Sequence, residues 1–184
     1  VNPNRQDDLS GLGHLCAAGV VFMLLVATAR ELRRRGAYGK GLAEPNLLAM
    51  LDIVALATVA DVVPLVGLNR AFVTKGLQVM RLRRNLGIRA LFDVAALNSP
   101  PTPYTLGFVL GPRINAGGRI GDAALGARLL STEDEAEAAR IAATLDRLNR
   151  ERKAIEIRML EEAIAEAGAR VDADPALPML LLGS

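Results

Sequence analysis

The amino-acid sequence predicts a predominantly α-helical chain with at most one or two short strands. Apolar residues make up 51% of its 184 residues, yet aromatic residues make up only 3% and Trp is absent. The core must therefore consist of Leu, Ala, Val and Ile, and such a core is usually helical. A mean hydropathy of +0.26 excludes a disordered chain, and the length suits one ordinary domain.

Charge and cysteine content narrow the class of protein further. A formal net charge of +2 and a pI near 9.0 make the chain mildly basic, which alone does not indicate a nucleic-acid-binding protein. The single cysteine, Cys16, excludes an internal disulfide framework and fits a reducing compartment, so we expect a cytoplasmic protein. The opening residues do not have the pattern of a signal peptide. The apolar run 15–29 is too short to span a membrane and is interpreted as a buried helix.

Apolar periodicity and helix-breaking residues predict a series of helices before residue 131. A polar loop, residues 1–13, precedes them. The second helix is apolar on nearly every side, which places it at the centre of the fold. The predicted helices cover 15–35, ended by Gly36; about 45–60, ended by Asp61; about 69–84; 88–97; and two helices within 107–130 that meet near Gly117 and Gly118.

A long helix follows. Thr132 and Glu135 predict a capping box at the start of a helix over residues 133–168, about 50 Å long at 1.5 Å per residue. Its apolar residues recur every three or four positions, so they form a seam for packing that Arg152 interrupts. The residues of this seam are Ala138, Ile141, Leu145, Leu148, Ile155 and Met159.

The two ends of the chain predict that it is a piece of a longer protein. The chain begins in a polar loop without an initiator Met and stops within an apolar run. We expect residues 172–178 to form a linker, and residues 179–182 to be the first strand of a further domain. The long helix would then connect two domains.

Asp61 is the first candidate for a functional residue. The segment ALATVADVVPL surrounds its carboxylate with apolar residues at a helix end. A buried carboxylate is costly unless it is paired or bound to a cation. The residues alone leave two interpretations open: a metal ligand facing a cleft, or a helix cap or ion-pair partner of a nearby Arg. Asp52, in the same helix, fits a buried ion-pair partner better.

Residues 107–130, GFVLGPRINAGGRIGDAALGARLL, hold the second candidate site. Arginine presents a fixed fork of donors that matches phosphate oxygens, and glycine lets a backbone approach a ligand closely. The segment therefore indicates capture of a phosphodiester in a cleft, although ion pairs between closely packed helices would explain the same residues. The polar members are Arg113, Asn115 and Arg119, among Gly107, Gly111, Gly117, Gly118 and Gly121.

Other polar residues fit structural roles. His14, the only histidine, starts a helix and has no neighbour at metal-ligand spacing. The arginine clusters within 33–35 and 81–84 are interpreted as solvated faces. They could attract a nucleic-acid backbone, but no aromatic residue beside them would stack a base. A Walker loop, a CxxC pair, an HExxH motif and a GxSxG motif are all absent from the sequence.

Taken in order, the sequence segments resemble the RecJ family of single-stranded-DNA-specific exonucleases, within the DHH phosphoesterase superfamily. The resemblance runs from Val1 to about Glu162 and is most specific in ALATVADVVPL and GPRINAGGR. The segments that carry it are VNPN, LCAAGVVFMLL, LDIVALATVADVVPLVGLNRAF, LGFVLGPRINAGGRIGDAALGARLL and LDRLNRERKAIE.

The resemblance implies an α/β phosphoesterase as the parent fold and hydrolysis of single-stranded DNA from 5′ to 3′ in DNA repair and recombination. It also implies two divalent metal ions, Mn²⁺ or Mg²⁺, held by aspartates and histidines of four motifs. Three motifs should lie upstream of Val1. Asp61 is the best match to the fourth, which favours its role as a metal ligand. Two metal ions suit phosphodiester hydrolysis because they activate water and stabilise the leaving oxygen.

The resemblance assigns roles around the glycines as well. Arg113, Asn115 and Arg119 match the family segment GPRxNAxGR, which lies close to the scissile phosphate. Either Arg113 or Arg119 would act as a catalytic residue by stabilising charge on the phosphoryl oxygens. The substrate-binding residues would be Asn115, Gly117 and Gly118.

The resemblance divides the chain into residues 1–132, the C-terminal half of a DHH domain, residues 133–170, a connector helix, and residues 171–184, a linker with the start of a truncated DHHA1 domain. Such a piece should be inactive by itself and monomeric. Expected partners of the whole enzyme are single-stranded DNA, a helicase and a single-strand-binding protein, with no membrane. The alternatives are a DHH phosphodiesterase for short oligonucleotides or cyclic dinucleotides, and a non-catalytic helical nucleic-acid-binding module.

Overall fold

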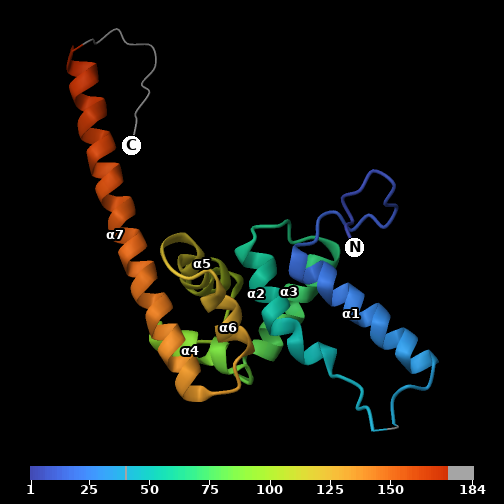
Figure 1. Cartoon of the computed structure of the whole chain (residues 1–184). Helices are drawn as coiled ribbons and strands as arrows, with labels where there is room; N and C mark the ends of the chain where they lie inside the picture. The colour runs from blue at the N-terminus through green and yellow to red at the C-terminus, as the bar shows by residue number, and fades with distance from the viewer. Residues whose placement is uncertain (40, 174–184) are drawn as a thin grey trace.

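The computed structural model describes residues 1–39 and 41–173, which form helices and loops and contain no strand (Figure 1). The predicted helical character is therefore confirmed. In chain order the elements are α1 (Ala17–Arg34), the 3₁₀-helix η1 (Leu47–Met50), α2 (Leu51–Ala60), α3 (Gly67–Met80), α4 (Leu86–Val94), the π-helix η2 (Thr105–Leu110), α5 (Gly111–Ile120), α6 (Ala124–Ser131) and α7 (Glu135–Ala173).

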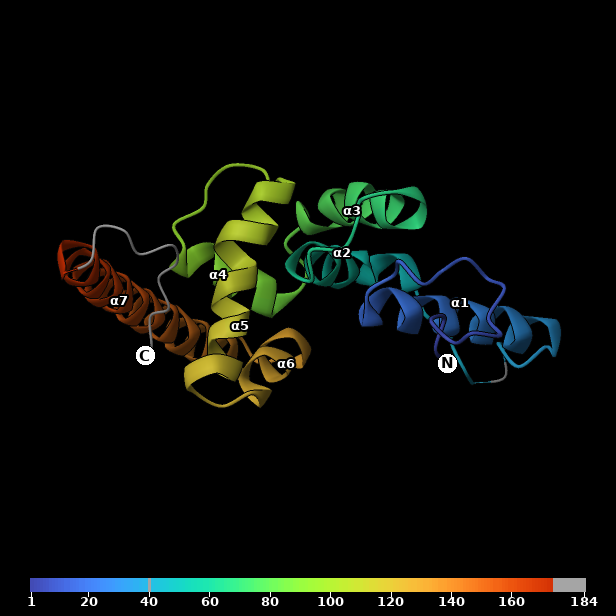
Figure 2. The ribbon, with the colours of Figure 1, turned by 90° about the horizontal axis from the view of Figure 1, so that it is seen from above.

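Two groups of helices make up the molecule. Figure 2 shows α1, α2 and α3 on one side and α4, α5, α6 and α7 on the other. α2 lies between the groups, and six of its ten residues are buried, as its apolar character predicts. α3 packs on α2 through Gly76, where an added Cβ would lie only 2.2 Å from the carbonyl oxygen of Leu51. The two backbones touch because glycine has no side chain at that point.

α1 lies at the edge of the molecule. Its Phe22 ring meets the ring of Phe72 in α3 edge to face, with centroids 5.4 Å apart. Gly36, with φ of 64°, follows the end of the helix as predicted. The expectation that this helix is buried is wrong, because only one of its faces meets the rest of the chain. Apolar side chains on its outer face are 37–53% exposed: Val21, Leu24, Leu25 and Val26.

The predicted seam of α7 is confirmed over its first half. There it packs against α4, α5 and α6, and the second half extends beyond every other helix in Figure 1. Ile155 is 38% exposed and Met159 is 50% exposed, so this part of the seam has no partner among the described residues. The buried members are Ala138, Ile141, Leu145 and Leu148.

The helix break within 107–130 lies later than predicted. The π-helix η2 runs directly into α5, so residues 105–120 form one continuous rod. The rod ends at Gly121 and not at Gly117 or Gly118. An added Cβ at Gly121 would lie 2.7 Å from Cδ1 of Leu148, so the chain turns where it passes closest to α7.

The predicted capping box of Thr132 and Glu135 is also wrong. Asp134 caps α7: its Oδ1 accepts hydrogen bonds from the backbone N–H groups of Ala136 at 2.7 Å and Glu137 at 3.1 Å. The hydroxyl of Thr132 instead donates to the Glu137 carboxylate at 2.6 Å, and the pKa of Glu137 is lowered chiefly by this bond.

Asp52 is buried in the first turn of α2 with 3% exposure. Its carboxylate accepts a hydrogen bond from the backbone N–H of Ile53 at 2.8 Å. No ion pair of Asp52 occurs in residues 1–39 and 41–173, so the expected buried ion pair is wrong there. Burial raises the pKa of this carboxyl group above its ordinary value, because the charged form is poorly solvated.

α7 continues to Ala173, so the predicted linker does not begin at residue 172. The predicted strand 179–182 lies outside the described residues. No helix in the described part of the chain combines the length and apolar character that a membrane crossing requires.

We predict that Gly76→Ala lowers the free energy of unfolding by about 2 kcal/mol, because overpacking a core has a cost of that order. The new methyl group would meet backbone atoms of α2 and not a side chain that could move away. Denaturant unfolding followed by circular dichroism measures the change. Gly118→Ala is the matched control: nothing lies within 4 Å of its added Cβ, so it should raise stability by roughly 0.5–1 kcal/mol. Equal effects of the two substitutions would contradict this packing.

Candidate functional site

α2 ends at Asp61, and the side chain of this residue is exposed. The expectation of a buried carboxylate is therefore wrong. Asp61 is the C-cap residue of α2, and its backbone N–H donates to the carbonyl oxygen of Ala57 at 2.9 Å, as the capping interpretation expects. Its carboxylate makes no hydrogen bond or ion pair with the described residues, so the interpretation as an Arg partner has no support there. The next residue, Val62, has a φ of 56°, which is strained for a β-branched side chain. Strained backbone of this kind occurs most often at functional sites.

Two cavities share a wall beside Asp61. The first has a volume of about 400 Å³ and is lined mainly by apolar residues of α1, α2 and α5, with Asp61 and Asn115 among the polar ones. The second has a volume of about 240 Å³ and is lined by Asn115, Arg119 and Arg152 together with small residues. Asn115 and Ala60 line both cavities. One exposed amide therefore lies between a free carboxylate and a pair of arginines.

Glycines bring the η2–α5 rod close to the end of α2. An added Cβ at Gly111 would lie 3.2 Å from Cβ of Ala60, and one at Gly107 would lie 3.2 Å from Cγ1 of Val59. Larger side chains would push the rod away from α2 and fill the second cavity, which both glycines line. The close approach that the glycines were expected to allow is thus present, and it sets the distance between Asp61 and α5.

Arg113 is held inside the protein. Its Nε donates a hydrogen bond to Oδ1 of Asp146 at 2.9 Å, and its Nη1 donates to the carbonyl oxygen of Val109 at 2.7 Å. The side chains of Arg113 and Asp146 are 16% and 14% exposed, and Arg113 lines neither cavity. For Arg113 the geometry favours the alternative interpretation, an ion pair between helices. Its catalytic role stays a prediction.

Arg119 differs from Arg113. It is exposed, lines the second cavity, and has no hydrogen bond or ion pair with any described residue. Gly117 is buried, and its added Cβ would lie 3.1 Å from Cδ2 of Leu145, so it has a packing reason to be glycine. Gly118 faces open space. Neither glycine lines a cavity, and their substrate-binding roles stay predictions.

Two features of this region were missed by the sequence reasoning. Arg152 of α7 lines the second cavity. The sequence contained a signal for this residue, because its cation interrupts the apolar seam of the helix. Tyr104 and Phe108 stack on each other with centroids 4.8 Å apart, at the start of the rod, and are 67% and 68% exposed. The two aromatic residues are four positions apart, shortly before GPRINAGGR, and residues at this spacing share one helix face. This spacing was the signal for the pair in the sequence.

The structure supports only part of a metal site. No group of three or more His, Cys, Asp or Glu residues within 1–39 and 41–173 could hold a metal ion. Asp61 fits one ligand position, since carboxylate oxygen is a preferred donor for Mg²⁺ and Mn²⁺ and this one is free. Nδ1 of His14 lies 3.1 Å from the carbonyl oxygen of Gly11, within its own loop, and its buried Nε2 has no hydrogen-bond partner among the described residues.

Comparison with known proteins agrees with this fold. No family model matches the chain. The single-stranded-DNA-specific exonuclease RecJ of Dickeya dadantii is 43% identical over 167 residues, which cover 89% of this chain and 29% of that protein. RecJ of Bacillus subtilis is 36% identical over 165 residues, which cover 89% of this chain and 19% of that protein.

Solved structures give the same relationship. The crystal structure of exonuclease RecJ bound to manganese matches with a TM-score of 0.74 and 36% identity, over 90% of this chain and 40% of the other. RecJ of Thermus thermophilus in complex with Mg²⁺ matches with a TM-score of 0.68 and 34% identity, over 89% of this chain and 24% of the other.

The helices around the two cavities therefore have the fold of one part of a DHH phosphoesterase. More narrowly, the chain is similar over nearly all of its length to one segment of the RecJ exonucleases, as ALATVADVVPL and GPRINAGGR predict. It spans less than a third of the length of the curated relatives reported above.

We predict that Arg113→Ala lowers the free energy of unfolding by about 3 kcal/mol, because it leaves the largely buried carboxylate of Asp146 without its main partner. The double variant Arg113→Ala/Asp146→Ala should lose less than the sum of the single variants, by roughly 1–2 kcal/mol. Chemical unfolding of the four proteins measures this coupling.

The exposed pair of Arg147 and Glu151 on the same helix is the control for this cycle. Its coupling should not exceed about 0.5 kcal/mol, because water screens it. A coupling for Arg113 and Asp146 as small as that of the control would show that the pair does not hold α5 to α7.

Proposed function

We propose that the chain is part of a metal-dependent exonuclease that hydrolyses single-stranded DNA from 5′ to 3′. The single observation that carries this proposal is the wall shared by the two cavities. On this wall the amide of Asn115 lies between a free carboxylate, Asp61, and a cavity lined by Arg119 and Arg152. A carboxylate that could hold a metal ion, beside arginines that could bind a phosphate, suits phosphodiester hydrolysis.

Asp61 would supply one carboxylate ligand to a divalent metal ion, Mn²⁺ or Mg²⁺. The metal-bound RecJ structures support this choice of ion. The remaining ligands would come from parts of the protein outside the described residues. When bound, such ions lower the pKa of a water molecule and stabilise the charge of the leaving oxygen.

Arg119 would bind the phosphoryl oxygens. Its planar guanidinium can donate two parallel hydrogen bonds to a phosphate, and it pairs with no carboxylate within residues 1–39 and 41–173. The Asn115 amide can donate a further hydrogen bond from the shared wall. We assign the charge-stabilising role to Arg119 and not to Arg113, because Arg113 is already paired with Asp146.

We also propose the domain arrangement that the resemblance implies. Residues 1–132 would be the C-terminal half of a DHH domain, 133–170 the connector helix, and 171–184 a linker with the start of a truncated DHHA1 domain. The exposed second half of the α7 seam supports this arrangement, because a following domain would cover it. The whole enzyme would act in DNA repair and recombination in the cytoplasm, with a helicase and a single-strand-binding protein as candidate partners.

The metal role predicts the behaviour of Asp61→Asn in the protein at its full natural length. This change should abolish Mn²⁺-dependent digestion of a 5′-phosphorylated single strand, because a neutral amide is a weaker metal ligand than a carboxylate. Release of labelled nucleotides measures the activity. Asp93→Asn, which alters an exposed carboxylate on α4, should keep it. Wild-type turnover by Asp61→Asn would refute the metal role.

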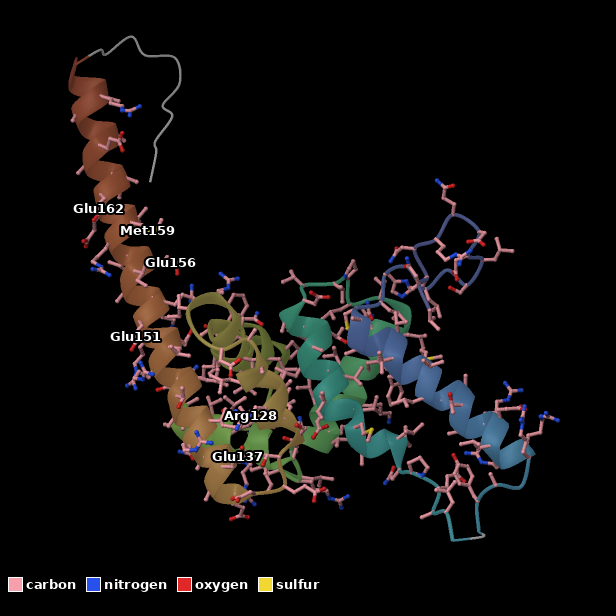
Figure 3. All side chains as sticks on the ribbon, in the orientation of Figure 1. Arg128, Glu137, Glu151, Glu156, Met159 and Glu162 are labelled. Carbon is pink, nitrogen blue, oxygen red and sulfur yellow. The ribbon has the colours of Figure 1, made fainter. Side chains whose placement is uncertain are left out.

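Arg119→Ala should lower kcat for the same digestion by about tenfold or more, because the phosphoryl oxygens lose a charged donor in the transition state. Steady-state kinetics on a single-stranded oligonucleotide measures this change. Arg128→Ala is the control, since Arg128 of α6 pairs with Glu137 of α7 at 3.0 Å and lines neither cavity. Figure 3 labels both residues, at the contact of α6 with the first half of α7. If both variants lost the same activity, the loss would not be specific to the cavity.

A further inference from the structure

Arg152 enters the second cavity from a different helix than Arg119. Its side chain is only 22% exposed, whereas Arg147 and Arg150 on the same helix are 59% and 71% exposed. Arg152 occupies a position at which the apolar seam of α7 would otherwise continue. Its guanidinium therefore lies on the side of α7 that faces α5.

The cavity therefore holds two guanidinium groups and one amide, and no carboxylate lines it. Two like charges in one half-enclosed space repel each other unless an anion lies between them. A volume of about 240 Å³ leaves ample room for a phosphate group with its waters. The pair of arginines favours an anion with several acceptor oxygens, which is what a phosphodiester offers.

Asn149 is a further polar side chain of α7 near Arg152, although it does not line the cavity. It lies three residues before Arg152, hence on the same face of α7, and is 2% exposed. Its Oδ1 is buried and has no hydrogen-bond partner in the described part of the protein. A buried acceptor without a donor is costly, but the two arginines of the lining, and not this amide, favour an anion in the cavity.

Glu156 is the present partner of Arg152. Nη1 of Arg152 donates to Oε2 of Glu156 at 2.7 Å, one helical turn along α7. Glu156 is 67% exposed and does not line the cavity. In Figure 3 it projects from the side of α7 that faces α5, and Glu151 projects from the other side. Because Glu156 is largely in water, its attraction to Arg152 is screened, so a phosphate could displace the carboxylate.

We propose that Arg152 is a second phosphate-binding residue, which together with Arg119 binds a phosphate group in this cavity. Glu156 occupies the guanidinium of Arg152 until the nucleic acid replaces it. The occupant is the backbone of a single strand, and the inference rests on the proposed phosphodiester-binding function of this cavity. It makes α7 part of the substrate site and not only a connector.

The test uses the protein at its full natural length without metal ions, so that binding is measured and cleavage does not occur. The probe is a fluorescent single-stranded oligothymidylate, and anisotropy gives its Kd over a series of salt concentrations. Arg152→Ala should raise Kd about tenfold, since it removes charge-assisted hydrogen bonds. The slope of log K against log salt should become shallower by about 0.7, the value for one phosphate contact on a single strand.

Arg147→Ala is the matched control, because Arg147 pairs with Glu151 at the same spacing and at 2.6 Å but lines no cavity. It should leave both Kd and slope unchanged. Glu156→Gln should strengthen binding about twofold by freeing Arg152, and Glu151→Gln should not. An unchanged slope for Arg152→Ala would overturn the proposal, as would equal effects of Glu156→Gln and Glu151→Gln.

If Arg152→Ala fails to fold, judged by circular dichroism, the two Gln variants decide alone. The outcome is also separable from the fate of the proposed function. A protein that binds the strand through Arg152 but shows no Asp61-dependent digestion would keep this inference and refute the metal role. A protein whose digestion of the strand needs Asp61, but which binds the strand without any contribution from Arg152, would keep the metal role and refute this inference.

Discussion

The ion pair between Arg113 and Asp146 is the constraint on which the candidate site depends. It joins α5 to α7 at a point where both side chains are largely removed from water. The cavity-lining residues Asn115 and Arg119 follow Arg113 on one helix, and Arg152 follows Asp146 on the other. Together with the apolar seam of α7, this contact fixes the relative position of two helices whose next turns carry the arginines. The ion pair between α5 and α7 therefore helps to position the polar side chains that line the neighbouring cavity.

The sequence predicts the helices well and their surroundings less well. α2 is central because its residues are apolar on every side, and that property can be read without a structure. The exposure of Asp61 could not be read in this way, because apolar neighbours in sequence do not bury a residue at a helix end. The same limit applies to the arginines. Arg113 and Arg119 have similar neighbours, and only the fold reveals that Asp146, 33 residues later, takes one of them.

Local signals also compete at helix boundaries. Gly117 and Gly118 suggest a break, yet the rod continues through them because its other residues pack on α7 and outweigh the low helix propensity of glycine. Thr132 and Asp134 are both good capping residues, and the one nearer to the first turn of α7 takes the role. The interruption of the seam at Arg152 was visible in the sequence. Its meaning was not, because the opposite wall of the cavity comes from a distant segment.

The π-helix η2 has a consequence for how tolerant this region is to change. A π-turn carries more residues than an α-turn. Each residue of an α-helix advances about 100° around the axis. The wide turn of Thr105–Leu110 absorbs its extra residue with little net rotation of the helix that follows, whereas removing one residue from the regular winding of α5 before Arg119 would rotate Arg119 by about that angle and carry it off its wall. In this stretch the number of residues, as much as their identity, determines the direction in which the phosphate-facing side chains point.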